Sequence, residues 1–588
     1  MKRLRTISVA ASSLVAAVVL AACGSGGGSG GSSASGGSNE AFNAGVTSVV
    51  NPSDHKGGTL TFLANGTPDS LDPGNTYYAY TFNFDRLYST PLLTYKSCPG
   101  ACSNQIVPGI ATGLGVVSDN GLVWTYHLKQ GLKFEDGTPV TAQDVKYAVE
   151  RTYDRSVLAN GPTYFPTLLA DSSYPGPYKD KNGNLTSVTT PDSYTIQFHL
   201  KAPFPDFNYV ATLPQTGPVP QAKDTGANYQ SHPLSTGPYE FQSYQLNKTL
   251  TLVPNPNWTQ NEDPQAKQLA SKIVVNFNVN SSDEDNRLLA GDADLDWEQV
   301  GVQPATRAKL LSNPSLQKYA DDALVNREWF AYLNTKVAPL TNVSCRQAIE
   351  YAANKTDLQT ALGGPQAGGD IASTIMLPGM PGYSKFDLYE ATTKPTGDLT
   401  KAKAALTACG KPNGFTIGAG YRADRPQEVA EATALQAALA RVGIQLQLHG
   451  YPQGSYYTDF AGVPNYVHSH NLGVDFGGWQ PDWPDGYGML DELLNGNTIA
   501  PSGNTNISEV NNSQINNLFS QAMSPSGNTS AAASNYGQID KMAMQQAYML
   551  PEVYAKALLY RNPNLTNAYI ADAFGGYNFA VLGVSNGS

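Results

Sequence analysis

The stretch Ser118–Arg151 reads SDNGLVWTYHLKQGLKFEDGTPVTAQDVKYAVER. Alternating β-branched and aromatic residues over 123–128 predict a strand, and the glycine turns at 129–131 and 135–137 frame a second short strand. Thr141 is expected to start a helix, because Asp144 completes a capping box and the residues that follow recur at helical spacing: Val145, Ala148, Val149 and Thr152. The stretch therefore predicts strand, strand, helix.

The wording of this stretch resembles the signature of the large extracytoplasmic solute-binding proteins of peptide and nickel ABC importers. Other stretches resemble further landmarks of that family and follow in the family's order. They are Ser70–Pro73, Ser235–Tyr239 with Val253–Trp258, Leu289–Asp294, Tyr332–Lys336 with Cys345–Ile349, Asp398–Gly410 and Val442–Ile444. The likeness therefore runs along most of the chain.

The resemblance implies an α/β, type II periplasmic-binding-protein-like fold, with two lobes joined by a hinge and an extra domain inserted in the first lobe. The implied segments are a lipoprotein signal peptide (1–22), a lipidated cysteine with its tether (23–54), the first lobe (55–90, 225–326 and 551–588), the inserted domain (91–224) and the second lobe (327–550). A cleft between two lobes can bury a small ligand on most sides.

Elements read from the residues alone agree with a mixed α/β chain. Strand-like runs are Thr59–Ala64, Tyr194–Leu200, Thr249–Val253, Ile273–Asn280 and Ile444–Leu448, and Pro426–Arg441 has the pattern of a helix. A length of 588 residues suggests about three to four units of ordinary size.

The N-terminus predicts export and lipidation. Three basic residues (Lys2, Arg3 and Arg5) precede an apolar run at Ile7–Leu20, and Leu20–Cys23 resembles a bacterial lipobox. Cys23 would then carry the acyl chains that hold the protein on the extracytoplasmic face of the cell membrane. The alternative is an ordinary signal peptide with a chance cysteine. Gly24–Ser38, almost entirely Gly and Ser, reads as a flexible tether that spans ~20 Å on average.

The charge of the chain excludes some partners. The formal net charge is −11, and removal of the signal peptide takes away three positive charges and leaves −14. Such an acidic protein is not expected to bind nucleic acid or to grip anionic lipid through basic patches. We expect a monomer whose partners are a short peptide, the permease and ATPase subunits of an ABC importer, and the membrane through its lipid anchor.

The loop Gly477–Asp485 is the centre of the predicted ligand site. It contains Gly478, Trp479, Gln480, Asp482 and Trp483, which suggests an aromatic platform beside negative charge. By its residues alone it could equally be a surface turn packed by tryptophan. In peptide-binding members of the family, the acid three positions after this tryptophan holds the ligand's ammonium group, and Asp482 stands there.

The resemblance also places the other contacts. Arg422 falls where dipeptide-binding members place an arginine for the ligand's carboxylate, although Arg425 lies nearby and an arginine in such a loop is commonly solvated. Phe476 replaces an arginine found in some oligopeptide binders, which weakens the interpretation as a receptor for longer peptides. Backbone groups of 478–480, and of Gly66, Thr67 and Asp69, would pair with an extended ligand.

Cysteine usage fits an exported protein. With Cys23 assigned to lipid, four cysteines remain and allow three disulfide pairings: Cys98, Cys102, Cys345 and Cys409. Cys98 and Cys102 can close locally, and the resemblance places the other two in one domain, so we prefer Cys98–Cys102 with Cys345–Cys409. A metal site is the poorer interpretation of these scattered thiols, and one built on His468 and His470, on one face of an assumed strand, is a minor alternative.

The function expected from the sequence is that of a substrate-binding lipoprotein of an ABC importer, without a cofactor and without enzymatic activity. GxSxG, HExxH and GxxxxGK[ST] motifs are absent. Three alternatives remain at this point: a receptor for a nickel chelate, a sugar or another small solute; an envelope lipoprotein of the same fold without a transport role; and an exported hydrolase.

Overall fold

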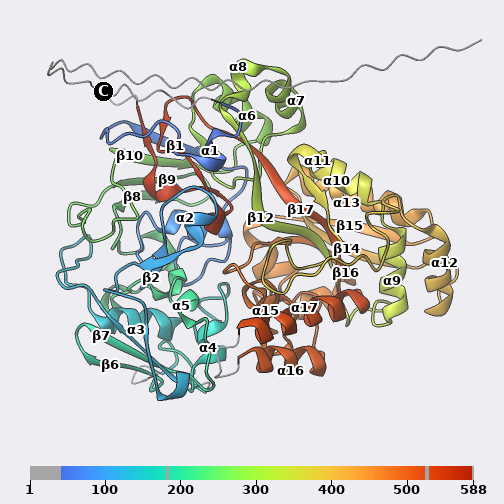
Figure 1. Ribbon diagram of the computed structural model, residues 1–588, viewed down its shortest axis with the longest axis horizontal. Coiled ribbons are helices and arrows are strands. Elements are labelled where there is room, and N and C mark those ends of the chain that lie inside the picture. The colour runs from blue at the N-terminus through green and yellow to red at the C-terminus, as the bar shows by residue number, and fades with distance from the viewer. Residues whose placement is uncertain (1–40, 172, 181–184, 524–528, 586–588) are drawn as a thin grey trace, which may run out of the picture. The chain divides into compact units, whose positions relative to one another are not determined.

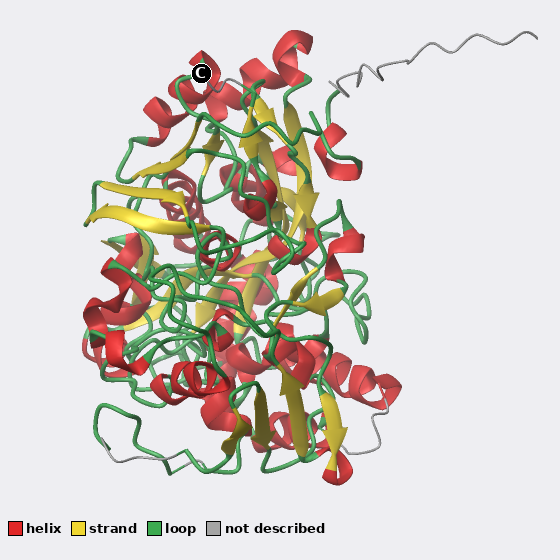
Figure 2. Ribbon diagram, turned by 90° about the vertical axis from the view of Figure 1, so that its left-hand side faces the viewer, coloured by secondary structure: helices red, strands yellow, loops and turns green. Residues whose placement is uncertain are grey.

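A computed structural model describes residues 41–171, 173–180, 185–523 and 529–585. The predicted signal peptide, Cys23 and the glycine-serine tether lie outside these residues. Helices and strands alternate along the described chain (Figure 2), which confirms the α/β class expected from the sequence. None of the helices among the described residues has the length and apolar composition needed to cross a bilayer.

The signature stretch folds as one strand and one helix. Strand β5 covers Val123–His127, and helix α3 covers Ala142–Arg151 with the capping box between Thr141 and Asp144 in place. The second predicted strand does not form, and Lys133 makes only an isolated bridge to Pro139. The backbone bonds that flank this bridge, from Phe134 N–H to Thr138 and from Val140 N–H to Leu132, close a tight turn and join too few residues to form a strand.

Three larger sheets organise the described chain. The first sheet has the order β11-β1-β10-β9-β8, the second β13-β17-β12-β16-β14-β15, and the third β4-β5-β7-β6. The first contains β1 (Thr59–Leu63), β8 (Tyr239–Gln245), β9 (Thr249–Pro254), β10 (Lys272–Asn276) and β11 (Leu295–Asp296). The second contains β12 (Ala320–Leu333), β13 (Gly369–Ile371), β14 (Thr416–Arg422), β15 (Gln445–Tyr451), β16 (Leu472–Trp479) and β17 (Met549–Tyr560). The third adds β4 (Val116–Ser118), β6 (Val188–Asp192) and β7 (Thr195–His199) to β5.

Three two-stranded pairs complete the strands: β2 (Leu93–Tyr95) with β3 (Ile106–Pro108), β18 (Leu565–Thr566) with β21 (Gly583–Val584), and β19 (Ile570–Ala571) with β20 (Gly576–Tyr577). The strand predicted over Ile273–Asn280 already ends at Asn276. The other predicted strands agree with β1, β7, β9 and β15 to within a few residues at their ends.

The helices up to residue 320 are α1 (Ala44–Thr47), α2 (Ala79–Asp85), α3, α4 (Tyr164–Leu168), α5 (Phe207–Val210), α6 (Ser281–Ala290), α7 (Pro304–Ser312) and α8 (Pro314–Gln317). Those that follow are α9 (Val343–Ala352), α10 (Lys355–Leu362), α11 (Gly364–Ala367), α12 (Leu399–Ala408), α13 (Pro426–Ala440), α14 (Pro464–Ser469), α15 (Gly486–Leu494), α16 (Ser513–Ala522) and α17 (Thr529–Gln545). Helix α13, which begins four residues after β14, matches its sequence prediction and packs against β14 and β15.

Strands β12 and β17 belong to two hydrophobic cores at once. They pair antiparallel along most of their length (Figure 1). Ala323 and Val325 of β12 pack in the core of the first sheet, whereas Phe330–Leu333 pack in the core of the second. The chain therefore passes between the lobes along these two strands, and the two-lobed type II fold is confirmed.

Two of the family's landmarks meet in a buried ion pair. Arg151, at the end of α3, places Nη1 3.0 Å and Nη2 2.5 Å from the two carboxylate oxygens of Asp72. Its Nε lies 3.2 Å from Asp224. The guanidinium is fully buried, and this fork-to-fork geometry is the strongest arrangement for such a pair. The pair therefore joins the end of α3 to the segment that precedes α2.

Candidate functional site

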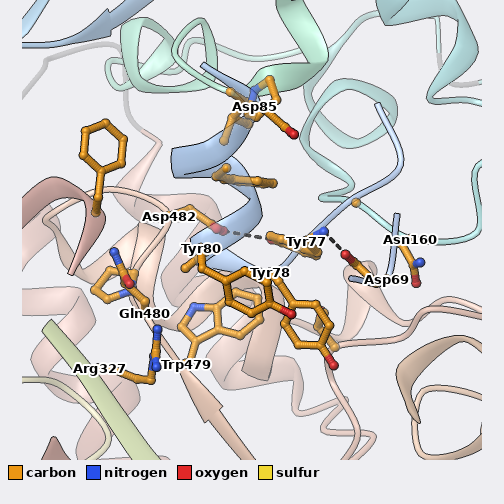
Figure 3. A pocket seen from close by; sticks show the side chains of 18 of the residues that line it. Asp69, Tyr77, Tyr78, Tyr80, Asp85, Asn160, Arg327, Trp479, Gln480 and Asp482 are labelled. Atoms are coloured by element: carbon orange, nitrogen blue, oxygen red, sulfur yellow. Dashed lines mark hydrogen bonds between the residues drawn. The ribbon is translucent and has the colours of Figure 1, made fainter. Parts of the chain in front are cut away.

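One large pocket is lined from both lobes (Figure 3). The first lobe and its inserted domain contribute side chains around α2 and residues 160–161 and 212–214, and the second lobe contributes the carboxyl ends of the parallel strands β14 and β16. Ligands of open α/β sheets bind at such strand ends. The pocket encloses about 1370 Å³ of empty space when the solvent at its mouth is counted.

Asp482 lies in this pocket and accepts hydrogen bonds across the cleft. Its Oδ2 accepts the hydroxyl of Tyr77 at 2.9 Å and that of Tyr164 at 2.6 Å. Burial raises the pKa of Asp482 well above its ordinary value, and although the two hydroxyls oppose that rise, the nearby carboxylates of Glu492 and Asp491 add to it. No Lys, Arg or His among the described residues forms an ion pair with it. The carboxylate therefore lacks a counter-ion in a poorly solvated place.

Aromatic rings and a glycine shape the wall next to Asp482. Trp479, the last residue of β16, meets the ring of Tyr77 edge to face at 5.2 Å between centroids. Gly478 pairs with Trp329 of β12, and a Cβ at this glycine would lie 2.2 Å from the Trp329 ring. A side chain at residue 478 would thus displace the tryptophan that lines the pocket.

Arg422 ends β14 and lines the pocket, but its charge is already matched. Its guanidinium pairs with Glu428 in the first turn of α13, and the same carboxylate accepts the Arg422 backbone N–H at 2.9 Å. Arg425 is shared between Glu298 at 3.5 Å and Glu428 at 4.0 Å. Each of these side chains is at least nine-tenths buried. Arg422 therefore lies in the pocket, as the sequence predicted. Its charge, however, is already neutralised by Glu428.

Arg327 is a further pocket cation that the sequence did not reveal. It lies on β12 and its guanidinium packs on Trp329, 5.2 Å from the ring centroid. Within the part of the chain that the structure describes, it forms no ion pair and no hydrogen bond. Burial lowers its pKa to about 10, and repulsion from Arg425 and Arg422 acts in the same direction. It remains charged at neutral pH.

The first-lobe residues predicted to contact ligand divide into two groups. Asp69 lines the pocket, where its carboxylate accepts Thr76 Oγ1 at 2.6 Å and the Tyr77 N–H at 2.7 Å. Burial raises the Asp69 pKa to about 6 against these hydrogen bonds. Gly66 and Thr67 do not line the pocket. The Gly66 N–H is bonded to Glu298 at 3.1 Å, and the Thr67 carbonyl accepts from Gln453 at 3.5 Å.

Gln480 lines the pocket, whereas Trp483 is part of the core. Gln480 donates Nε2 to the Ala573 carbonyl at 3.2 Å, and its Oε1 has no partner among the described residues. Trp483 lies between the rings of Tyr209 and Tyr487, nearly parallel to both at 5.8 and 5.9 Å between centroids, and faces a second cavity. Its position therefore does not bring it to the ligand, and Phe476 is likewise fully buried in the core.

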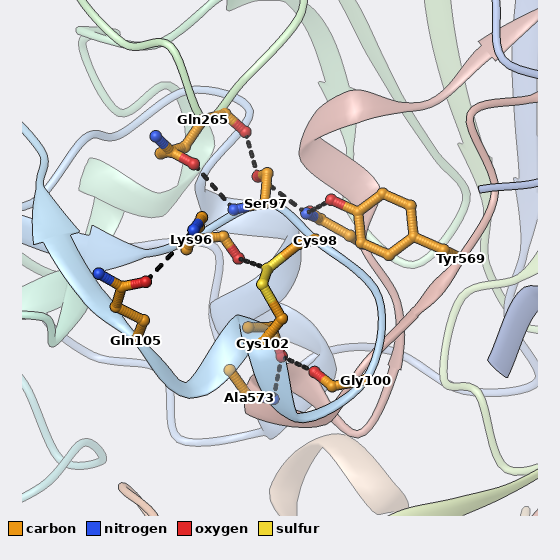
Figure 4. Close-up of a disulfide and its surroundings, with 11 residues drawn as sticks. Lys96, Ser97, Cys98, Gly100, Cys102, Gln105, Gln265, Tyr569 and Ala573 are labelled. Atoms are coloured by element: carbon orange, nitrogen blue, oxygen red, sulfur yellow. Dashed lines mark hydrogen bonds between the residues drawn. A yellow bond between two sulfur atoms is a disulfide. The ribbon is translucent and has the colours of Figure 1, made fainter. Parts of the chain in front are cut away.

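The structure contains the disulfides Cys98–Cys102 and Cys345–Cys409, the pairing preferred from the sequence. The loop closed by Cys98–Cys102 packs against the C-terminal segment (Figure 4), where Ser103 Oγ accepts the Ala573 N–H at 3.1 Å. Since Ala573 lines the pocket and holds Gln480, this loop supports one wall of the site.

The histidine pair does not form a metal site. It lies at the end of α14 and not on a strand, so residues two apart do not share a face. His468 pairs with Glu509 at 2.6 Å, and His470 stacks on Tyr466 at 3.8 Å. The described residues contain no group of three or more ligands that could hold a metal ion.

Comparison with known proteins decides the family. The profile of the bacterial extracellular solute-binding proteins, family 5, matches residues 105–500, which is more than half of the chain. The chain belongs to this family. Its members are solute-binding proteins that act outside the cytoplasm.

Individual relatives of this solute-binding protein cover most of its length. A solved structure titled "Clavulanic acid biosynthesis oligopeptide binding protein 2" is 36% identical, with a TM-score of 0.84 over 94% of this chain and 99% of that one. The "Probable D,D-dipeptide-binding periplasmic protein DdpA" of Escherichia coli K12 is 27% identical over 78% of this chain and 81% of its own. "Heme-binding protein A" of Haemophilus influenzae is 26% identical over 72% and 74%.

Sequence reasoning missed Tyr77 and Arg327, which line the solute-binding pocket, and Tyr164, which donates a hydrogen bond to Asp482. Tyr77 and Tyr164 precede Asp482 by 405 and 318 residues, so no local spacing connects them to it. Arg327 stands outside every recognised landmark. For Arg422 a signal was present, since Glu428 falls in the first turn of the predicted helix six residues later.

Proposed function

We propose that this protein is the substrate-binding lipoprotein of an ABC importer, which captures short peptides between its lobes and delivers them to a membrane permease. The observation that carries the proposal is Asp482, a pocket carboxylate bonded to two hydroxyls and to no cation. A ligand ammonium group is the counter-ion that such a carboxylate lacks, because a charge taken out of water needs an opposite charge and hydrogen bonds. Free peptides supply this group.

Relatives support a peptide but do not restrict the family to peptides. One similar protein is named for a dipeptide and one solved structure for an oligopeptide, whereas another relative is named for heme. A receptor for another small solute is therefore the second candidate. Mass spectrometry of the ligand that co-purifies with the native protein distinguishes the two, and a ligand without a free amine would reject the peptide proposal.

Capture requires the lobes to close around the ligand, and the segment boundaries expected from the sequence place the crossing points near residues 327 and 551. Residue 327 lies in strand β12, and residue 551 lies in strand β17. A ligand that contacts both lobes favours the closed arrangement by the contacts made only there. The Tyr77–Asp482 bond joins the lobes in the arrangement described here.

Binding of an ammonium group at Asp482 is expected to release a proton. The pKa of Asp482 is raised by burial, and a bound cation would lower it again, so affinity should fall as the pH decreases from neutral toward the ordinary aspartate pKa of about 4. Calorimetry of a dipeptide in buffers of different ionisation enthalpy measures the release, which should occur in the parent and vanish in Asp482→Asn. Equal proton release by the parent and this variant would assign it to another group.

Anchoring is proposed from the lipobox at Leu20–Cys23, and Cys23→Ala should test it. Without the thiol that accepts the diacylglyceryl group, the variant is expected to appear in the soluble extracytoplasmic fraction or as an uncleaved precursor. Fractionation and mass spectrometry of the N-terminal peptide are the measurements. A variant that is still processed and membrane-bound would contradict lipid anchoring at this residue.

A further inference from the structure

A bulge in β12 determines where Arg327 points. Leu324 pairs with Lys556 of β17, and the next paired residue is Glu328 with Tyr554, so three residues of β12 have to be accommodated opposite one residue of β17. Asn326 within this bulge has a positive φ of 45°, and its Nδ2 donates to the Asp572 carbonyl at 3.0 Å. Bulges of this kind commonly redirect side chains beside active or binding sites.

Side chains on the two sides of this strand have different surroundings. Arg327 and Trp329 line the pocket, whereas Glu328 between them is fully buried in the second lobe. Figure 3 shows Arg327 together with Gln480 and Asp482 among the pocket side chains. Arg327 therefore faces the space where a ligand would bind. The neighbouring carboxylate of Glu328 points into the second lobe and does not pair with it.

The other arginines that line the pocket are bound to groups of the protein. Arg422 pairs with Glu428, and Arg425 with Glu298 and Glu428. Arg86 donates Nη1 to Asn578 at 2.7 Å, packs on Phe574, and has the carboxylate of Asp263 as its electrostatic partner. Among the described pocket cations, Arg327 alone lacks both a hydrogen bond and an ion pair.

We infer that Arg327 binds the anionic end of the ligand, so that the pocket selects a molecule with an ammonium group for Asp482 and a carboxylate for Arg327. This inference rests on the proposed function and names the residue that binds the carboxylate, a role that the family resemblance implied for Arg422. A planar guanidinium that has no partner can offer two parallel N–H donors to a carboxylate, as bidentate pairs do.

The electrostatics of the wall agree with this assignment. Arg422 and Arg425 lie close enough to repel Arg327, and this repulsion and burial together lower its pKa to about 10. An incoming carboxylate would relieve both effects, because it supplies opposite charge and hydrogen-bond acceptors where water is scarce.

The test compares alanyl-alanine with its C-terminal amide, by calorimetry on the full chain in detergent. The parent should prefer the free acid, and Arg327→Gln should weaken the free acid by about ten- to a hundredfold while sparing the amide. Arg327→Lys should show a preference for the free acid that lies between those of the parent and Arg327→Gln, because lysine keeps the positive charge but lacks the two parallel N–H donors of the guanidinium. Arg287→Gln is the matched control, since Arg287 lies on α6 away from the pocket and should bind like the parent.

Arg422→Gln supplies the contrast. It would leave the buried Glu428 with the distant Arg425 as its nearest cation, so the melting temperature of Arg422→Gln should fall. Arg327→Gln should melt like the parent, because no carboxylate loses a partner. If Arg422→Gln abolishes the preference for the free acid and Arg327→Gln keeps it, the assignment to Arg327 is overturned.

Acetate gives a readout that does not depend on peptide binding. Titration with acetate should change the tryptophan fluorescence of the parent saturably, because Arg327 lies on Trp329, and the response should be at least tenfold weaker in Arg327→Gln. An acetate response without binding of any dipeptide would reject the peptide proposal and keep Arg327 as the anion site. Equal acetate responses in the parent and the variant, or none in either, would reject Arg327 whatever the peptides do.

Discussion

Replacement of Asp482 by asparagine is expected to weaken binding of a free dipeptide by roughly ten- to more than a hundredfold, because charge-assisted hydrogen bonds contribute about 1.5–3 kcal/mol. The same variant should bind the N-acetylated dipeptide as the parent does, since that ligand has no ammonium group to lose. The amide oxygen of asparagine can still accept the hydroxyls of Tyr77 and Tyr164, so the wall of the pocket should keep its geometry. Calorimetry with the capped and uncapped dipeptides measures the difference.

Asp485→Asn is the matched control for Asp482→Asn. Asp485 lies in the same loop but caps α15 through a 2.9 Å bond from the Gly488 N–H, a bond that asparagine can also accept. This control should therefore bind both ligands like the parent. Equal losses for capped and uncapped ligand in Asp482→Asn would mean that the residue acts through folding and not as a counter-ion.

Arg151→Met is expected to lower the free energy of unfolding by about 3–5 kcal/mol, the range found when one member of a buried pair is removed. The variant would leave Asp72 and Asp224 buried without their guanidinium. Denaturant unfolding followed by circular dichroism is the measurement. An additional Asp72→Asn substitution should recover part of the loss, because it removes one of the two uncompensated charges.

Lys223→Met provides the comparison for Arg151→Met. Lys223 and Asp136 form an ion pair at 3.4 Å, but the lysine side chain is 55% exposed, and pairs of this kind contribute only about 0–1 kcal/mol. If Arg151→Met lowers the free energy of unfolding no more than Lys223→Met does, the Arg151–Asp72 ion pair is not a main source of stability.

Local chemistry explains what could be predicted from the sequence. The capping box at Thr141 and the helix from Pro426 follow from residues adjacent in the chain. Arg422 and Trp479 were expected in loops, but they are the last residues of β14 and β16. The two-lobed fold was predicted from the resemblance to the solute-binding family. It also directed attention to Asp482, which lies in the pocket, and to Gly66, which does not line it.

What could not be predicted depends on contacts between distant segments or on competition for one group. Trp483 and Trp479 are four residues apart in one loop, yet Trp483 is buried between two tyrosines that belong to different parts of the chain. The partners of Asp482 come from the opposite lobe. The bulge that turns Arg327 into the pocket depends on the pairing of β12 with β17, which no pattern within β12 discloses.

The alternation of β12 bears on how ligand preference could change during evolution. Arg327 faces the ligand and the next residue, Glu328, faces away. Since successive side chains of a strand point to opposite faces, a shift of this segment by a single position exchanges the two sets. The loss or gain of one codon near Asn326 that moves Glu328 out of its register with Tyr554 and Trp479 would thus present an acid in place of the base. A homologue with such a length change would be expected to accept cationic cargo at this wall.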